Sequence, residues 1–479
     1  MSARASSVLR RFQLHLALLL TCGCPLVVAG QAVPEGLLAR LDAVRQEEQV
    51  PAMGLALVST RQALHVGAYG VRDLESMVSV DEDTVFRVGS ITKTFTSLGA
   101  LVLQERGLLR LDDLVTKHLD NPPFDNPWAD EAPVRIAHLL EHTAGLQDMI
   151  PDEWAVTEPM SLDQALAFRP ASRRLHWPPG THSSYSNSGA GVAAKVFEEV
   201  TGQAFEPFLR AALFTPLGLD TATLTPTPRT LAHLAQGYDR DGRTPMAYWH
   251  MLYPAFGALN LTPRDMVPLL QLLLGEGEIE GERLLARESI ARLESPRTTL
   301  AAKAGLTTWG YGLGNYTWAR KGVIWHGHGG DADGYLAHYG YSRELDRGYF
   351  LVITAFRKSS LKRLRRVIED ALAEEAASLA PTPPPIAALT PSELDAYVGE
   401  YRSATTRFAG SSGKRMVIER EGGRLLTRIG DGPPRPLLPV GDHTFRRPWE
   451  PAATSAFVRD REGTLYLQGD MGNLQRVTP

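Results

Sequence analysis

Two groups of strand-like segments lie far apart in this chain, and any compact fold has to bring them together. The first lies between Met53 and Val71, where β-branched and alternating residues predict strand, turn and strand. The pattern from about residue 94 to 300 is mostly helical, with interruptions at proline and glycine. Strand-like runs return at residues 311–318, 322–326, 336–341 and 349–356, before a helix expected over residues 361–377. We therefore expect an α+β fold, in which an antiparallel sheet flanked by helices carries an inserted helical region.

A proline-rich segment separates this region from the end of the chain. Residues 379–391, with the run APTPPP, have the composition of a semi-rigid linker. Short strand candidates separated by turn signals follow, namely YVGEY, RMVIE, RLLTRI, TSAFVRD and TLYLQG. This regular pattern predicts a small antiparallel β-barrel or sandwich. We expect one domain over residues 31–378 and a second over residues 392–479.

The N-terminus has the features of a secretory signal peptide. Three arginines precede an apolar run over residues 14–29, and small residues precede Gln31, which predicts a leader over residues 1–30 and an exported, periplasmic or secreted protein. The run is too short and too interrupted to span a membrane comfortably. Both cysteines, Cys22 and Cys24, lie in this leader, so the mature chain has neither disulfide nor thiolate metal ligand. A lipid anchor at Cys22 remains an alternative.

Ser90 and Lys93 form the first candidate for catalysis. Residues three apart on a helix share one face, and apolar residues at helical spacing predict a helix from Ile91 to Arg106, with Gly107 as its stop. A serine hydroxyl becomes a good nucleophile only when a base takes its proton. Lowering a lysine pKa from about 10.4 to near neutrality requires about 4 kcal/mol, which burial in a closed pocket and the helix N-terminus can supply.

Further motifs in a fixed order strengthen this candidate. The chain contains SITK at 90–93, HLLEHTAGL at 138–146, PPGTHSSYSNSG at 178–189 and HGGDADGY at 328–335. With these motifs it resembles the serine β-lactamase and penicillin-binding-protein superfamily, specifically the class C-like branch that also holds D-amino-acid peptidases, D-Ala-D-Ala carboxypeptidases and esterases. The resemblance covers roughly residues 35–375 and implies the β-lactamase/transpeptidase-like fold and a metal-free acyl-enzyme mechanism with no cofactor. The C-terminal segment resembles the lipocalin-like module that some members carry.

The resemblance also implies roles for individual residues. Ser90 would be the nucleophile and Lys93 its base. Tyr185 would share the proton and pass it to the leaving group, which requires neighbouring cations such as Lys93 to lower its pKa. Asn187 would orient Lys93 and hydrogen-bond the substrate. The implied substrate-binding and oxyanion groups are completed by His328 and Gly330, the first and third residues of the triplet His328-Gly329-Gly330, and by the backbone N–H groups of Ser90 and Asp331.

Lactamases carry a lysine at the first position of this triplet, where this chain has His328. Histidine is mostly neutral at pH 7, so His328 would grip a lactam carboxylate weakly, and we favour a peptidase or esterase over a β-lactamase. The expected substrate is a small molecule or short peptide, with cell-wall peptides among the candidates. A net charge of −4 gives no indication of nucleic-acid binding. The sequence leaves the oligomeric state open.

Two other functions remain open at this stage. The same scaffold could be a catalytically silent protein that binds cell-wall peptides. Alternatively, His138, Glu141 and His142 spell the H-x-x-E-H pattern of a zinc peptidase, although the resemblance explains this stretch as the end of a helix that runs into a loop. Aromatic residues near the motifs, Tyr311 among them, could line a substrate pocket or simply pack in the core.

Overall fold

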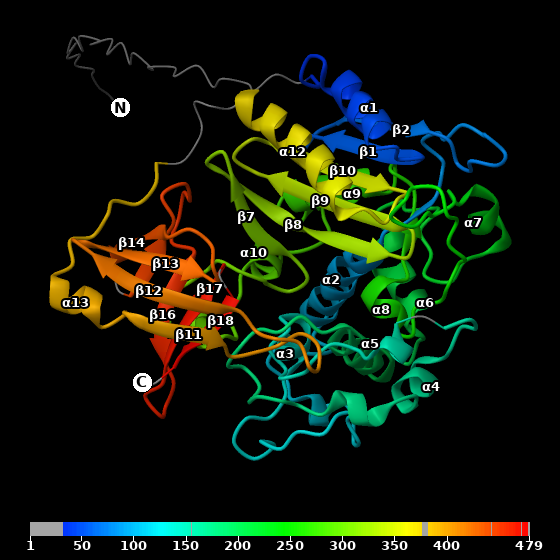
Figure 1. Ribbon diagram of the computed structural model, residues 1–479. Coiled ribbons are helices and arrows are strands. Elements are labelled where there is room, and N and C mark those ends of the chain that lie inside the picture. The colour runs from blue at the N-terminus through cyan, green and yellow to red at the C-terminus, as the bar shows by residue number, and fades with distance from the viewer. Residues whose placement is uncertain (1–31, 155, 376–381, 442, 471, 478–479) are drawn as a thin grey trace, which may run out of the picture.

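A six-stranded antiparallel sheet forms the centre of the first domain. The computed structural model describes residues 32–154, 156–375, 382–441, 443–470 and 472–477, so the expected leader lies outside the described residues. The strand order is β2-β1-β10-β9-β8-β7, which places the early strands beside the late ones, as expected (Figure 1). The strands are β1 (Ala52–Val58), β2 (Ala63–Gly70), β7 (Tyr316–Arg320), β8 (Val323–Ala332), β9 (Tyr335–Ser342) and β10 (Arg347–Ile353).

The two faces of this sheet are covered differently. Helices α1 (Leu37–Glu47) and α12 (Lys358–Glu375) contact each other and lie together over one face (Figure 1). The opposite face packs on the inserted helical region, where α9 (Met266–Leu274) contacts β1, β9 and β10. The remaining helices of this domain are α2 (Thr92–Glu105), α3 (Ile136–Leu140), α4 (Leu162–Ala167), α5 (Asn187–Thr201), α6 (Phe205–Leu209), α7 (Pro228–His233), α8 (Pro254–Gly257), α10 (Arg287–Glu294) and α11 (Leu300–Lys303). Helix α13 (Pro391–Asp395) packs on the C-terminal barrel instead. Two short strand pairs, β3 (Phe86–Arg87) with β4 (Asn260–Leu261) and β5 (Glu278–Ile279) with β6 (Glu282–Arg283), complete the first domain.

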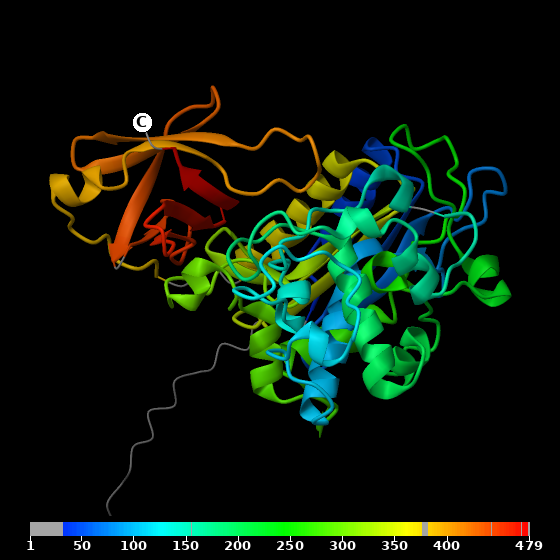
Figure 2. The ribbon, with the colours of Figure 1, turned by 90° about the horizontal axis from the view of Figure 1, so that it is seen from below.

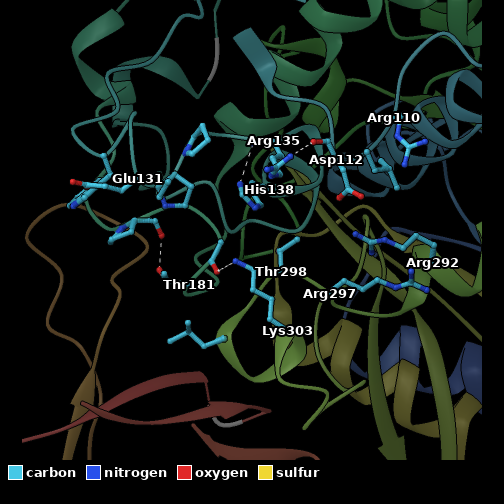
Figure 3. Close-up of a pocket in the computed structure, with 18 of the residues that line it drawn as sticks. Arg110, Asp112, Glu131, Arg135, His138, Thr181, Arg292, Arg297, Thr298 and Lys303 are labelled. Atoms are coloured by element: carbon cyan, nitrogen blue, oxygen red, sulfur yellow. Dashed lines mark hydrogen bonds between the residues drawn. The ribbon is translucent and has the colours of Figure 1, made fainter. Parts of the chain in front are cut away.

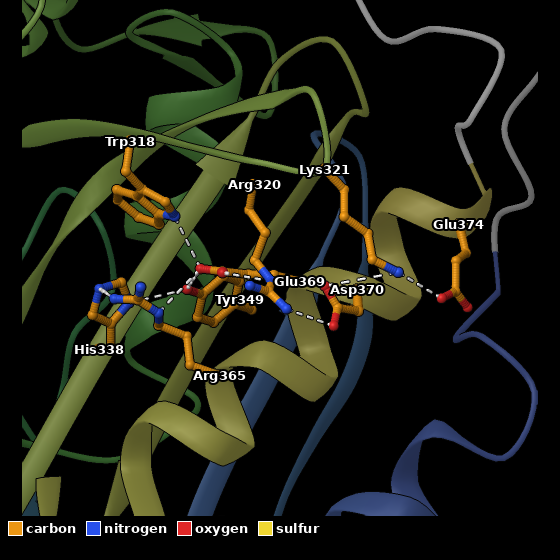
Figure 4. A network of polar contacts seen from close by, with 9 residues as sticks. All are labelled: Trp318, Arg320, Lys321, His338, Tyr349, Arg365, Glu369, Asp370 and Glu374. Atoms are coloured by element: carbon orange, nitrogen blue, oxygen red, sulfur yellow. Dashed lines mark hydrogen bonds and ion pairs between the residues drawn. The ribbon is translucent and has the colours of Figure 1, made fainter. Parts of the chain in front are cut away.

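A buried polar network joins α12 to the sheet (Figure 4). The Glu369 carboxylate accepts hydrogen bonds from Trp318 Nε1 at 3.1 Å and from the Tyr349 hydroxyl at 2.7 Å. Arg365 pairs with Glu369 at 3.3 Å and donates to His338 Nε2 at 2.9 Å. Burial raises the pKa of Glu369, while its arginine and hydroxyl partners act in the opposite direction. The network joins α12 to the sheet and gives most of these polar groups a partner, although, among the described residues, Glu369 Oε2 and Arg365 Nε accept or donate no hydrogen bond.

The C-terminal domain is a closed barrel of eight antiparallel strands, which confirms the expected fold class. Its strands are β11 (Gly399–Ser403), β12 (Arg415–Glu421), β13 (Arg424–Ile429), β14 (Arg435–Gly441), β15 (Thr444–Arg446), β16 (Ser455–Arg459), β17 (Leu465–Gly469) and β18 (Gly472–Arg476). The sequence patterns missed three of them. Strand β14 contains two prolines, which lower strand propensity, and β15 has only three residues. Strand β18, with the sequence GNLQR, contains a single apolar residue, so no alternating pattern marks it.

Side chains fill the interior of the barrel. Tyr397, Tyr401, Phe445 and Phe457 form an aromatic cluster in which ring centroids lie 4.5 to 5.9 Å apart. The other buried residues of this core are Leu394, Met416, Ile418, Leu425, Leu437, Leu465, Leu467 and Leu474. A barrel packed in this way is a solid scaffold for the loops at its ends. No helix among the described residues has both the length and the apolar character that a bilayer crossing needs.

Candidate functional site

Ser90 lies in a tight turn immediately before helix α2. The turn is the 3₁₀ segment Gly89–Ile91, and α2 begins at Thr92, one residue from the expected start. Gly89 has a φ of +53°, a conformation that favours glycine. Lys93 lies in the first turn of α2 and is 3% exposed, whereas Ser90 is partly exposed. The turn therefore presents the hydroxyl to the surface of the domain and directs the lysine inward.

Lys93 makes three hydrogen-bond contacts that suit a neutral amine. Its Nζ lies 3.0 Å from Ser90 Oγ, 2.6 Å from Asn187 Oδ1 and 2.9 Å from the carbonyl oxygen of Phe256. The two carbonyl oxygens can only accept, so a neutral Nζ donates to both and keeps its lone pair for the Ser90 hydroxyl. Burial holds the pKa of Lys93 well below its usual value. Lys93 is thus placed and poised to take the Ser90 proton.

Strand β8 passes the nucleophile at a distance that only glycine allows. A Cβ atom on Gly330 would lie 1.8 Å from the carbonyl oxygen of Val88 and 3.1 Å from the amide nitrogen of Ser90. A Cβ on Gly89 would lie 2.7 Å from the amide nitrogen of Asp331. The backbone N–H groups of Ser90 and Asp331 therefore lie in neighbouring segments, as an oxyanion hole requires. The Asp331 side chain instead faces outward, where it pairs with Lys358 at 2.6 Å.

Tyr185 lies beside this pair, but its ionisation differs from our expectation. Its hydroxyl is hydrogen-bonded to the Ser90 side chain, and Lys93 Nζ lies 4.9 Å from the centre of its ring. The sequence analysis expected neighbouring cations to lower the pKa of Tyr185. Burial raises it instead, and this effect exceeds the opposing effects of the Ser90 hydrogen bond and the Arg407 charge. Tyr185 therefore remains a protonated phenol, so it can donate a proton but does not act as a phenolate in the resting site.

His328 on β8 is a neutral, buried imidazole. Its Nδ1 lies 2.5 Å from the carbonyl oxygen of Gly329, which can only accept, so Nδ1 carries the proton. Its Nε2 then accepts from the Tyr311 hydroxyl at 2.8 Å. Burial, and to a smaller extent Lys93 in its protonated form, lower the pKa of His328 to about 3. The first position of the triplet therefore carries no positive charge at neutral pH.

The residues of the H-x-x-E-H pattern have other partners. Glu141 forms an ion pair with Arg292 and accepts from the backbone N–H of Thr298 at 2.9 Å. His138 Nδ1 accepts from the backbone N–H of Arg135 at 3.2 Å. His142 packs its ring 4.2 Å from that of Tyr185, so it forms part of the wall of the site. Within the described residues, no group of three His, Cys, Asp or Glu side chains is arranged to hold a metal ion.

Several residues of the site were not singled out by the sequence analysis. Asp148 is buried and accepts from the backbone N–H of Asn187 at 2.8 Å and from its side-chain Nδ2 at 3.3 Å. Phe256 supplies a carbonyl oxygen to Lys93. Tyr311, which the sequence analysis named only as an aromatic residue near the motifs, supplies a hydroxyl to His328. Arg407, from the barrel, places its guanidinium 4.6 Å from the centre of the Tyr185 ring. The position of Asp148 just after the HTAGL segment was a usable signal, whereas no motif marks Arg407.

A separate cavity lies between the two domains (Figure 3). Its volume is about 1620 Å³, and neither Ser90, Lys93 nor Tyr185 lines it. Both basic and acidic side chains line it, including Arg297, Lys303, Arg461, Glu131, Asp112 and Glu462. With both charges present in similar number, its lining does not favour a ligand of one sign. The catalytic groups lie outside this cavity, at the edge of β8.

Comparisons with known proteins identify the family of the first domain. The beta-lactamase family model matches residues 37–373. Penicillin-binding protein 4 of Amycolatopsis lactamdurans is 32% identical over 314 residues, which are 62% of this chain and 79% of that protein. The octameric penicillin-binding protein homologue from Pyrococcus abyssi has a TM-score of 0.57 and 19% identity, covering 92% of this chain and 99% of its own.

A further solved structure shares the fold of the first domain. EstCE1, described as a hydrolase with promiscuous acyltransferase activity, has a TM-score of 0.56 and 20% identity, covering 70% of this chain and 98% of its own. At these identities the two structures show the fold alone. The family model covers well over half of the sequence, and its match includes all four motifs. The chain belongs to the beta-lactamase family of serine hydrolases.

Proposed function

We propose that this protein hydrolyses an amide or ester through an acyl-enzyme on Ser90. The observation that supports this most directly is the position of Lys93 Nζ, within 3.0 Å of Ser90 Oγ and held by two carbonyl oxygens. An amine of lowered pKa, next to a hydroxyl at the entry of a helix, is the arrangement that serine activation requires. The active centre consists of side chains and backbone N–H groups and uses no cofactor.

The reaction has two halves, acylation of Ser90 and hydrolysis of the acyl-enzyme. Ser90 Oγ attacks the substrate carbonyl carbon while Lys93 Nζ takes the hydroxyl proton, and the backbone N–H groups of Ser90 and Asp331 stabilise the oxyanion. The bond to the leaving group then breaks as Tyr185 donates its proton to the departing amine or alkoxide and recovers one from Lys93. In the second half, water attacks the acyl carbon and gives a proton to Lys93 Nζ. Lys93 then returns this proton to Ser90 Oγ as the bond between Oγ and the acyl carbon breaks, which releases the carboxylic acid and restores the hydroxyl.

The environment of His328 favours peptidase or esterase activity over β-lactamase activity. Its imidazole is neutral and holds the Tyr311 hydroxyl, so the triplet offers no fixed charge to a lactam carboxylate. The nearby Arg407 is compensated by Asp148, with which it forms an ion pair at 2.7 Å. We therefore propose D-amino-acid peptides and esters, with cell-wall peptides among the peptide candidates, as the substrate class.

A side-by-side substrate assay tests this function. Purified protein is offered p-nitrophenyl esters, D-amino-acid p-nitroanilides and a chromogenic cephalosporin, and the adduct left by a fluorophosphonate is located by mass spectrometry. We expect turnover of an ester or D-amino-acid amide, an adduct on Ser90, and loss of both in Ser90→Ala. Ser76→Ala, at an exposed serine, is the matched control. Wild-type turnover in Ser90→Ala or Lys93→Ala would refute the mechanism.

The same assay distinguishes the other candidates. A silent binding protein would show no adduct and no turnover, and a zinc peptidase would lose activity with a chelator. Cephalosporin hydrolysis faster than ester or amide hydrolysis would make the protein a β-lactamase proper. We also propose, from the sequence of the leader alone, that the protein is exported. N-terminal sequencing of the secreted or periplasmic protein should begin near Gln31, whereas a lipid-modified Cys22 would indicate an anchored form.

A further inference from the structure

The loop between β11 and β12 leaves the barrel and reaches the catalytic domain (Figures 1 and 2). Its contacts there are made by consecutive residues. The Thr405 hydroxyl donates to the carbonyl oxygen of Ser183 at 3.2 Å, and Thr406 Oγ1 accepts from Gln147 Nε2 at 2.9 Å. The carbonyl oxygen of Arg407 accepts from the backbone N–H of Asp148 at 2.7 Å. These bonds fix the loop on both segments that line the Tyr185 side of the site.

Two barrel strands also form hydrogen bonds with the segment that contains Thr181 and Ser183. Asn473 on β18 donates to the carbonyl oxygen of Ser183 at 2.8 Å. Gln468 on β17 donates to the carbonyl oxygen of Thr181 at 2.9 Å and accepts from the backbone N–H of Ala301 at 2.8 Å. The stretch that leads into Tyr185 is therefore held between the barrel and the catalytic domain. Since side chains fill the barrel interior, the barrel acts on the site through these contacts of its outer surface.

The Arg407 side chain extends this support to the catalytic groups. Its Nε and Nη2 donate to Asp148 Oδ2 at 2.8 and 2.7 Å, and its guanidinium covers the ring of Tyr185. Asp148 in turn accepts from both the backbone and the side-chain nitrogen of Asn187. An amide held by its Nδ2 in this way must turn Oδ1 toward Lys93, where it lies at 2.6 Å. One chain of contacts thus connects the barrel to the general base.

We infer that the barrel is a working part of the active site, in which Arg407 is a positioning residue that acts through Asp148 and Asn187 on Lys93 and through stacking on Tyr185. This inference rests on the proposed hydrolase function. Without Arg407, the buried Asp148 carboxylate loses its charged partner, and the Asn187 amide loses a fixed acceptor. A positioned side chain displaced by about 1 Å can lower turnover by about 100-fold.

The charges around Lys93 affect its pKa, which can be measured and which a purely structural role of Arg407 would not change. Asp148 and Asp331 raise the pKa of Lys93, while Arg407 lowers it and burial lowers it most. His142 and His328 also face this group, and burial keeps both neutral at pH 7. Removal of Arg407 should therefore raise the pKa of Lys93, and neutralisation of Asp148 should lower it. The acidic limb of the pH profile of kcat/KM should move in opposite directions in the two variants.

The experiment compares Arg407→Met, Arg407→Lys, Asp148→Asn and the double variant Arg407→Met/Asp148→Asn in the full chain. Arg415→Met is the matched control, because this exposed arginine of the same barrel pairs only with Glu400 among the described residues. In Arg407→Met we expect kcat to fall about 10- to 100-fold with KM within about threefold, and Arg407→Lys to recover part of the loss. The double variant should be little worse than either single variant.

Each outcome decides the inference. Wild-type kcat and an unshifted pH profile in Arg407→Met would overturn it, as would a rise in KM alone, which would make Arg407 a substrate contact. Circular dichroism and thermal unfolding show whether Arg407→Met folds. If it does not, the kcat and pH profiles of Arg407→Lys and Asp148→Asn are compared instead. Fluorophosphonate labelling of Ser90 in the wild type separates the two proposals: no labelling refutes the hydrolase function itself, whereas labelling with unaffected variants refutes only the role of the barrel.

Discussion

Substitution of Gly330 by alanine tests whether β8 and the nucleophile turn together form the oxyanion hole. The added Cβ would lie 1.8 Å from the carbonyl oxygen of Val88, whereas tolerated contacts begin at about 3.0 to 3.4 Å. Strand and turn must therefore separate by about 1.2 to 1.6 Å. This moves the backbone N–H of Asp331 away from that of Ser90, and loss of one oxyanion donor costs about 10²- to 10³-fold in kcat, or about 2.7 to 4 kcal/mol.

The neighbouring Gly329 supplies a matched control. A Cβ at this position would meet its nearest atom, on His338, at 3.4 Å, which is an ordinary contact. Steady-state kinetics on the best ester or amide substrate should show the loss in Gly330→Ala and near-normal kcat in Gly329→Ala. Thermal unfolding should show a cost of about 1 to 3 kcal/mol for the first variant, as expected for overpacking. A folded Gly330→Ala protein with wild-type kcat, or an equal loss in both variants, would refute this account of the oxyanion hole.

Two further predictions concern the general base and the core. Lys93 must be neutral to accept a proton, so kcat/KM should fall as the pH decreases through its lowered pKa, and a pH–rate profile measures this fall. Activity that stays constant down to the pH of unfolding would contradict the role of Lys93. Trp325 on β8 is 0% exposed between the sheet and α12, so Trp325→Ala should lower the free energy of unfolding by about 3 to 5 kcal/mol in denaturant titrations, whereas the exposed Trp449→Ala should change it little.

Local patterns in the sequence were sufficient for much of the first domain. Helix α2 begins within one residue of the expected position because apolar spacing and a following glycine are local signals. Strands β1 and β10 were recognisable from β-branched and apolar runs. Strand β8 extends to Ala332, well beyond the expected end at His326, since its glycines have low strand propensity and only pairing with β9 makes them a strand.

The sequence by itself determined the spacing of Ser90 and Lys93, the order of the motifs and the change from an α+β region to an all-β region, because these depend on neighbours along the chain. Tertiary structure decided how the site is charged and supported. Burial keeps Tyr185 a protonated phenol, contrary to expectation. The fold also brings Asp148 and the barrel residue Arg407 together, and the Arg407 guanidinium lies over the Tyr185 ring. Desolvation and long-range ion pairing depend on what surrounds a group in space, and 259 residues separate Asp148 from Arg407 along the chain.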